Sequence, residues 1–232
     1  MILFHSPKGG SGSTTAAANL ALILARRGRD VTVMDLTGQG VLGLYLGGDP
    51  DGGDVSTRIV EDRMVVLSGV QLVSVDRRQP AQILLSEILR LESSGRTLIV
   101  DVAAGDRTML DLLLPRAQVR LCVLTPEPAA LAVLPQACVE VARAQADPTL
   151  FILNRLDDRF RLGRDIAGLF RSLLGEKLLG TIRRDEAVNE AAAMMETLER
   201  YAPASAAMED FNIMADAVLD RLARFAARGL AG

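Results

Sequence analysis

Short apolar runs alternate along this chain with longer segments whose apolar residues recur at helical spacing. That order is typical of strand–helix–strand units, in which parallel strands are covered by helices on both faces of the sheet. Several runs are apolar at both odd and even positions, as strands buried on both faces require. We therefore predict one α/β domain over residues 1–232, built on a twisted, mostly parallel sheet of about seven strands. The expected strands are Ile2–His5, Val31–Asp35, Gln71–Val75, Leu98–Val102, Val119–Thr125, Phe151–Asn154 and Leu178–Ile182, and the expected helices are Thr14–Arg27, Pro80–Glu92, Arg107–Pro115, Pro128–Ala144, Leu162–Leu174 and Glu186–Arg200.

The composition excludes several classes of protein. An apolar fraction of 49% over 232 residues suits a large buried core, and a net charge of −3 without a long basic block makes DNA an unexpected partner. The chain has two cysteines, Cys122 and Cys138, which are too few for a disulfide framework, and we expect both thiols in the core. With a single histidine, His5, most zinc sites are also excluded. We see no secretory leader and no apolar window long enough to span a membrane, and we expect a cytoplasmic protein. Peripheral attachment at the inner membrane face or cell pole stays open.

A glycine-rich segment joins the first expected strand to an alanine-rich helix. It reads Ser6-Pro7-Lys8-Gly9-Gly10-Ser11-Gly12-Ser13-Thr14-Thr15. Glycines allow close approach of the backbone, and a helix N-terminus directs N–H groups at phosphate oxygens. The spacing is that of a phosphate-binding loop, but the standard pattern GxxxxGK[ST] fails twice, because Pro7 stands at its first glycine and Ser13 at its lysine. Only two of the 26 basic residues are lysines, Lys8 and Lys177, which we attribute to coding bias outside this loop.

The segment resembles the deviant Walker A motif of the ParA/MinD family, KGGxGK[ST]T. The resemblance implies a P-loop NTPase fold that binds ATP or ADP with Mg²⁺. It makes Lys8 the signature lysine, which in this family reaches across a face-to-face homodimer to the partner's nucleotide. Thr14 then binds Mg²⁺, Thr15 contacts the α-phosphate, and Ser13 replaces the usual lysine. The loop residues so assigned to the nucleotide are Lys8, Gly9, Gly10, Ser11, Gly12, Ser13, Thr14 and Thr15.

Three later segments resemble motifs of the same family, in the family's order. Val31–Gly40 resembles the second-strand motif, with Asp35 as its first aspartate, near Mg²⁺, and Thr37 in place of the aspartate that positions the attacking water. Leu98–Asp101 resembles Walker B, in which Asp101 holds Mg²⁺ through water. Asn154 stands where the family reads the adenine edge. The resemblance thus assigns Lys8 and Asp35 to catalysis and Thr14, Asp35 and Asp101 to the metal.

Two substitutions remove parts of the hydrolytic machinery. Ser13 carries no positive charge, so one charge-assisted contact of about 1.5–3 kcal/mol is weakened or lost. Phosphoryl transfer needs neutralised charge and an oriented water, and Thr37 weakens the second requirement. We expect nucleotide binding with slow or absent hydrolysis. The alternative is an active ParA/MinD-type ATPase that positions DNA, a septum or another cargo.

The same substitutions point to one branch of the family. A small hydroxyl residue at 13, the missing second aspartate and the run Arg184-Asp185-Glu186-Ala187 resemble BcsQ, also called YhjQ, an accessory protein of bacterial cellulose synthesis. Lys8 departs from it, since BcsQ can carry arginine there. The resemblance implies a partner in a cellulose synthase or secretion complex. It also brings Arg184 or Asp185 to the bound nucleotide, with a solvated charged turn as the favoured alternative.

Two segments stay open in function. Thr37–Arg63, with Gly47–Gly53 inside it, is rich in Gly, Pro and Asp and is expected to be an exposed loop at the ligand-binding edge. It is either a plain surface loop or a nucleotide-responsive or partner-facing one. Met208–Leu230 carries an apolar stripe at helical spacing, which we expect to pack on its own domain. Membrane contact through this helix is the less favoured interpretation.

Overall fold

The computed structural model describes residues 1–47, 64–76, 78–132, 134 and 149–229. Their centre is an eight-stranded sheet in the order β3-β4-β2-β5-β1-β6-β7-β8, in which every neighbouring pair except β3 and β4 is parallel. The predicted α/β fold is confirmed. The strands are β1 (Ile2–His5), β2 (Val31–Leu36), β3 (Met64–Leu67), β4 (Val70–Ser74), β5 (Thr97–Val102), β6 (Val119–Leu124), β7 (Leu150–Leu156) and β8 (Leu178–Arg183).

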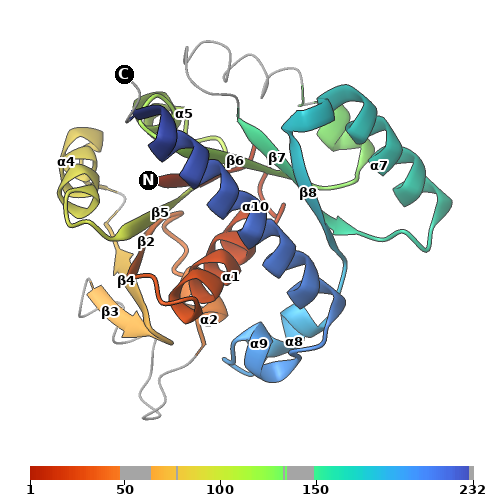
Figure 1. Cartoon of the computed structure of the whole chain (residues 1–232), viewed down its shortest axis with the longest axis horizontal. Helices are drawn as coiled ribbons and strands as arrows, with labels where there is room; N and C mark the ends of the chain where they lie inside the picture. Colours follow the sequence, from red (N-terminus) through yellow and green to blue (C-terminus); the bar gives the residue numbers. More distant parts are fainter. Residues whose placement is uncertain (48–63, 77, 133, 135–148, 230–232) are drawn as a thin grey trace.

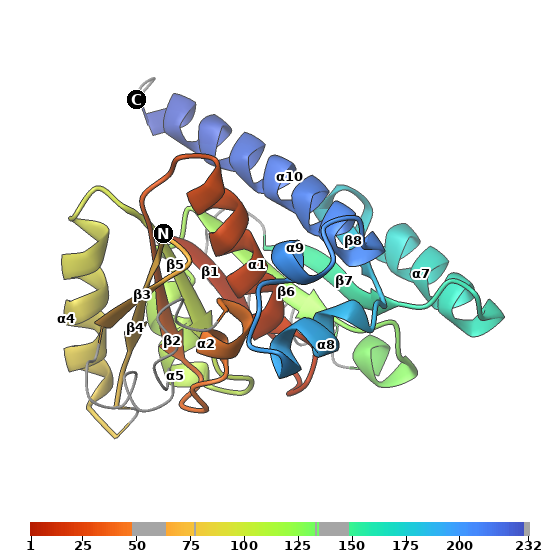
Figure 2. The ribbon, with the colours of Figure 1, turned by 90° about the horizontal axis from the view of Figure 1, so that it is seen from below.

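Helices cover both faces of the sheet (Figures 1 and 2). α1 and α10 pack on one face, and α4, α5 and α7 pack on the other. Within β1, Ile2 and Phe4 belong to the first of these cores and Leu3 to the second, because successive side chains of a strand point to opposite faces. The helices are α1 (Ser13–Arg26), α2 (Leu42–Tyr45), α4 (Ala81–Glu92), α5 (Arg107–Leu113), α7 (Arg161–Leu174), α8 (Ala187–Ala193), α9 (Leu198–Tyr201) and α10 (Ala206–Gly229), with a 3₁₀ turn at Gly175–Lys177.

The sequence analysis missed one strand, and one of its helix predictions was wrong. β3 is an additional edge strand, joined to β4 by Ser68 and Gly69, whose φ angles of 48° and 80° are typical of a type I′ hairpin turn. The helix expected over Glu186–Arg200 is two helices, because the chain leaves α8 through Met195 at φ 53° and α9 begins after Thr197. A left-handed residue after the last helical turn reverses the chain direction there.

Three expectations concern segments that the structure describes only in part. The loop expected over Thr37–Arg63 contains the short helix α2, and residues 48–63 lie outside the described part of the chain. The helix expected over Pro128–Ala144 is helical at residues 128–132 and 134, and the rest of it also lies outside. Cys122 is buried, as predicted, whereas Cys138 is outside the described residues.

The apolar stripe of α10 packs on the domain itself. Phe211, Met214 and Val218 are at most 2% exposed and belong to the core that contains α1, while Phe225 is 38% exposed. The favoured interpretation of this segment therefore holds for the first half of the stripe. None of the helices in the described ranges is long and apolar enough to cross a membrane.

Candidate functional site

The glycine-rich loop leaves β1 and ends at the first turn of α1. Gly10 and Gly12 have φ angles of 76° and 86°, the left-handed region that favours glycine. At Gly12 the requirement is twofold, because a Cβ atom there would lie 2.1 Å from Nδ2 of Asn154. The amide of Ala16 donates to the Gly12 carbonyl at 3.0 Å, which starts the helix and leaves the earlier loop N–H groups outside its hydrogen bonding.

A cavity of about 390 Å³ opens in front of this loop, at the edge of the sheet where the parallel strands have their carboxyl ends. The hydroxyl Oγ of Ser11 is buried at this cavity and has no hydrogen-bond partner among the described residues. An unsatisfied donor at a helix N-terminus fits an anionic ligand such as phosphate. The cavity is lined by Ser6, Gly9–Thr15, Thr37, Gln39, Val41, Tyr45, Asp101–Ala104 and Arg155.

Two carboxylates lie side by side at the floor of this region. Asp35 on β2 and Asp101 on β5 are directly paired in the sheet. Thr14 Oγ1 and Ser13 Oγ donate to the two oxygens of Asp101 at 2.6 and 2.8 Å. Thr37 donates to Asp35 Oδ1 from its backbone N–H at 2.8 Å and from its hydroxyl at 2.6 Å. Both carboxylates are therefore held by neutral donors.

Burial dominates the electrostatics of Asp101. The side chain is fully buried, and removal from water raises its pKa from 3.8 to about 7, while the Thr14 and Ser13 hydroxyls work against that rise and the Asp35 charge adds to it. Mg²⁺ prefers hard oxygen ligands, and a hydroxyl with two carboxylates suits it when phosphate and water complete the shell. The described residues contain no group of three or more His, Cys, Asp or Glu that could hold a metal. The donor set fits a metal that arrives with a nucleotide.

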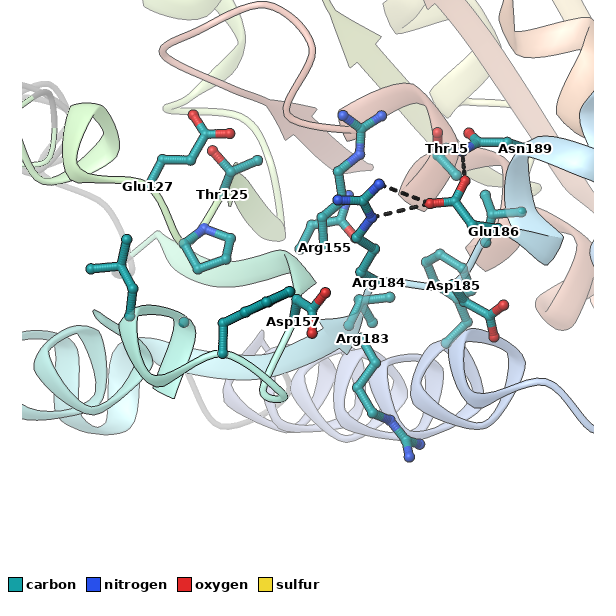
Figure 3. A pocket seen from close by; sticks show the side chains of 18 residues that line it. Thr15, Thr125, Glu127, Arg155, Asp157, Arg183, Arg184, Asp185, Glu186 and Asn189 are labelled. Atoms are coloured by element: carbon teal, nitrogen blue, oxygen red, sulfur yellow. Dashed lines mark hydrogen bonds and ion pairs between the residues drawn. The ribbon is translucent and has the colours of Figure 1, made fainter. Parts of the chain in front are cut away.

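A second cavity, of about 490 Å³, adjoins the first, and Figure 3 shows the residues that line it. Thr15 and Arg155 line both. Asn154, in β7, donates from Nδ2 to the Ser11 carbonyl at 2.8 Å, so it ties this cavity to the loop. The other lining residues include Thr125–Glu127, Asp157, Phe160, Leu162, Ile182–Glu186, Val188, Asn189 and Phe211.

Comparison with known proteins agrees with this arrangement. The model of a family described as the CobQ/CobB/MinD/ParA nucleotide binding domain matches residues 2–198. The chain belongs to this family. It is 30% identical over 242 residues to the chromosome-partitioning ATPase Soj of Thermus thermophilus, covering 95% of this chain and 96% of Soj. It is also 27% identical over 212 residues to a putative septum site-determining protein MinD of Guillardia theta, covering 81% and 76%.

Solved structures of MinD proteins share the fold. In the MinC:MinD complex of Aquifex aeolicus, a chain superposes with a TM-score of 0.76 at 20% identity, over 94% of this chain and 95% of that one. MinD of Pyrococcus horikoshii, complexed with Mg-ADP, gives a TM-score of 0.71 at 23% identity, over 94% and 96%. At these identities the likeness is one of fold.

Within this ParA/MinD fold, some of the predicted site residues lie at the loop cavity, and the side chains of others are engaged elsewhere. Gly9–Thr15, Asp101 and the hydroxyl of Thr37, which binds Asp35, gather at the loop cavity. Lys8 does not line it, because its Nζ forms an exposed ion pair with Glu127 Oε2 at 3.1 Å. The Ser13 hydroxyl, considered as a donor to phosphate, instead donates to Asp101.

Both residues of the charged turn, Arg184 and Asp185, line the second cavity, but their side chains are engaged differently. Arg184 donates from Nε and Nη2 to Glu186 at 3.1 and 2.9 Å. The carboxylate of Asp185 accepts the backbone N–H groups of Ala187 and Ala207, at 3.1 and 3.2 Å. Asp185 therefore fixes the starts of α8 and α10, a structural role that its position in the sequence does not indicate.

Sequence reasoning gave no role to Arg155, although it follows Asn154 directly. Arg155 donates from Nη1 to the Gly10 carbonyl at 3.0 Å and lines both cavities. The available signal was that it directly follows Asn154, the position to which the family resemblance assigns contact with adenine. Nothing in the chain order alone says that it reaches back to the loop, since the contact spans 145 residues.

Proposed function

We propose that this chain binds ATP or ADP with Mg²⁺, dimerises in response to the nucleotide, and hydrolyses ATP slowly or not at all. We further propose that it regulates or localises a bacterial cellulose synthesis or secretion complex. The observation that carries the first proposal is the pair of hydroxyl residues, Ser13 and Thr37, whose side chains are engaged with Asp101 and Asp35.

The loop cavity accounts for binding. Backbone N–H groups between Gly9 and Thr15 would surround the phosphates, and the buried Ser11 hydroxyl is a donor without a partner among the described residues. Thr14, Asp35 and Asp101 would hold Mg²⁺, which when bound neutralises phosphate charge. The second cavity, beyond Thr15, has the volume and mixed lining of a base and ribose site.

ATP hydrolysis requires groups that nucleotide binding does not, namely a positive charge beside the phosphates and an acceptor for the attacking water. A lysine at position 13 would place a full charge beside the phosphates, whereas Ser13 is 8% exposed and donates to Asp101. At position 37 a carboxylate would accept a hydrogen bond from the attacking water, whereas the Thr37 hydroxyl donates its proton to Asp35. Loss of both contributions leaves a nucleotide-responsive switch with a slow reset.

The cellulose role rests on the sequence resemblance to BcsQ. Besides Ser13 and Thr37, it depends on the run Arg184–Ala187, which forms the rim between the second cavity and α8. A chain segment that contacts both the nucleotide cavity and the outer helices is suited to report nucleotide occupancy to a partner. The partner would be a component of the cellulose synthase or secretion complex.

Restoring the two family residues tests the catalytic part. Wild-type protein should turn over ATP well below about 1 s⁻¹, at the low end of enzyme rates, and the double variant Ser13→Lys with Thr37→Asp should be at least about tenfold faster. Phosphate release measured with and without Mg²⁺ gives both rates. Wild-type turnover of about 1 s⁻¹ or more that is abolished by Asp101→Ala would refute slow hydrolysis.

The biological part needs the host cell. Deleting the gene should lower cellulose output, wild-type protein should restore it, and Thr14→Ala should not. Dye binding to cellulose measures the output, and a fluorescent fusion shows whether the protein gathers at the inner membrane face or a cell pole. Unchanged cellulose with misplaced chromosomes or septa would favour the alternative, a ParA/MinD-type positioning ATPase, which the similarity to Soj and MinD also allows.

A further inference from the structure

The arginines that line the two cavities differ in whether a carboxylate forms an ion pair with them. Arg183 pairs with Asp210 and Glu209, and Arg184 pairs with Glu186. In Figure 3, Arg183 points away toward α10, whereas Arg155 lies beside the linked Arg184 and Glu186. Among the described residues Arg155 has no carboxylate within ion-pair distance, and its guanidinium makes one hydrogen bond, to the neutral Gly10 carbonyl. The Arg155 charge acts on the Glu186 carboxylate only beyond ion-pair distance, where it helps to lower the pKa of Glu186 after the stronger effects of Asn189 and Arg184. No ion pair with a described residue neutralises Arg155, so its charge is available to an anion.

Arg155 also stands where a phosphate would need that charge. No other basic residue of the described chain lines the loop cavity, and Lys8 is directed to Glu127. Ser13 stands where the family has a lysine, and Lys8 is paired with Glu127. Among the residues that the structure describes, Arg155 is therefore the one cation that lines the loop cavity. Its exposed side chain is free to adjust to a ligand.

The backbone places the side chain there at an energetic cost. Arg155 has a φ of 58°, a conformation that residues other than glycine seldom adopt, and the pairing of β7 with β8 is irregular between Leu153 and Leu156. Irregular strand pairings re-aim side chains near functional sites, and strained residues there persist because the surroundings hold them. Without the irregularity, the side chains of 154 and 155 would point to opposite faces of the sheet. With it, both reach the loop, at Ser11 and Gly10.

We propose that Arg155 is a phosphate-binding residue of the nucleotide site, acting within one protomer and supplying charge that Ser13 lacks. This inference rests on the proposed nucleotide binding. A guanidinium carries five N–H donors, so Nη1 can stay on Gly10 while the others meet phosphate oxygens. Because the contact is made within the protomer, it strengthens binding of ADP by the monomer, which a cross-dimer lysine does not.

The test distinguishes the effect of the Arg155 charge on phosphate binding from the effect of its hydrogen bond to the Gly10 carbonyl. Arg155→Gln keeps a donor for the Gly10 carbonyl but removes the charge, whereas Arg155→Lys keeps the charge. Titration calorimetry of adenosine, AMP and ADP with Mg²⁺ should show ADP binding weakened about ten- to a hundredfold in Arg155→Gln, adenosine unchanged within about twofold, and most of the ADP affinity retained in Arg155→Lys. Arg90→Ala, which removes an exposed, ion-paired arginine on α4, is the matched control and should bind all three like wild type.

Other outcomes have distinct meanings. Equal ADP affinity in Arg155→Gln and wild type, or equal losses for adenosine and ADP, would overturn the inference and leave Arg155 as a brace of the loop. Wild-type protein that binds none of the three ligands would refute the proposed function instead. If Arg155→Gln fails to fold, Arg155→Gly, which relieves the positive φ, must show the same selective loss of ADP affinity for the inference to stand.

Discussion

Asp101 lines the loop cavity that we propose as the phosphate site, and its environment is unusual for a carboxylate. It is fully buried between the Ser13 and Thr14 hydroxyls and beside Asp35, and no cation of the described residues forms an ion pair with it. Such a group favours its neutral form, because two neutral hydroxyl donors compensate only in part for the lost hydration of the charged carboxylate. In the family motif a lysine occupies position 13, so the serine changes the charge balance of Asp101 as well as that of the phosphates.

Replacing Asp101 by asparagine should stabilise the nucleotide-free protein, and more so at high pH. The pKa of Asp101 is about 7 in the folded state against 3.8 for an ordinary aspartate. Between these values the folded protein keeps a proton that the unfolded chain has released, so the free energy of unfolding falls as pH rises from about 4 to about 7. Asp101→Asn abolishes that loss, and the gain over wild type should be larger at pH 8 than at pH 5 by a few kcal/mol, on the order of 1.4 kcal/mol per pKa unit.

Protonation of His5 changes the free energy of unfolding with pH in the opposite direction, so the experiment must cancel its contribution. Its burial lowers its pKa from 6.5 to about 4, so the unfolded chain binds the extra proton and stability rises with pH over that window. Because both proteins contain His5, the difference between Asp101→Asn and wild type removes its contribution. Urea unfolding with a chelator at both pH values gives the difference, and an equal gain at both would contradict the role assigned to Asp101.

The sequence predicted which residues would gather at the loop better than it predicted their contacts. Gly12 is a case where the motif and the structure agree, since no side chain fits between the loop and Asn154. The contact of Asp185 with two helix starts, by contrast, joins residues 22 positions apart through a turn whose path the sequence does not fix. Polar residues in a charged turn look alike from sequence, whether they face a ligand or a backbone amide.

At the scale of elements, the turn after β8 joins the second cavity to the C-terminal helix α10. Arg183 extends from β8 to Asp210 and Glu209 on α10, and it also donates to the Ala206 carbonyl at 3.2 Å. Asp185 accepts from the first residue of α8 and from the second residue of α10. Two successive helices are thus positioned by one short segment.

Asp185→Ala should therefore affect stability more than nucleotide affinity. Removing a side chain that satisfies helix N-terminal N–H groups costs about 0.5–2 kcal/mol for one helix, and here two helices lose an acceptor. Urea unfolding should show that the free energy of unfolding falls by about 1–3 kcal/mol. At a temperature where both proteins are folded, the ADP affinity should stay within about threefold of that of wild type. Asp165→Ala, which removes an exposed acid whose ion-pair partner among the described residues is Arg161, is the control and should cost under about 0.5 kcal/mol. A large loss of ADP affinity at unchanged stability would make Asp185 a nucleotide ligand instead.

The sequence predicted helices and strands correctly where the pattern of apolar residues alone decides the structure. All seven expected strands form, with ends that shift by at most about two residues, because strands buried on both faces are continuous apolar runs. β3 was missed although Ser68-Gly69 between two apolar runs is a hairpin signal, since half of its short run is exposed. The break between α8 and α9 had a weaker signal, because Met195 adopts a positive φ without a glycine or proline nearby.

At the scale of the whole molecule, the proposed nucleotide-dependent dimer depends on whether Lys8 is able to reach a second copy of the chain. Lys8 and Glu127 are both more than half exposed, so their ion pair contributes at most about 1 kcal/mol. Lys8 can therefore leave Glu127 at little cost. The structure of one protomer is thus compatible with the cross-dimer contact that the family resemblance implies for Lys8.

Lys8→Ala should abolish the ATP-dependent dimer, since it removes the only lysine of the loop and with it the charge offered to the partner's nucleotide. Lys177→Ala, which removes the chain's other lysine from an exposed 3₁₀ turn, should leave the dimer intact. Glu127→Gln should keep or strengthen it, because Lys8 then has no competing carboxylate at that position. Light scattering with ATP and Mg²⁺ measures the mass of each variant, and ADP titration first confirms that Lys8→Ala still binds nucleotide. A dimer of unchanged mass and affinity in Lys8→Ala would mean that protomers meet through another surface, and Lys8 would then be a surface cation whose partner is Glu127.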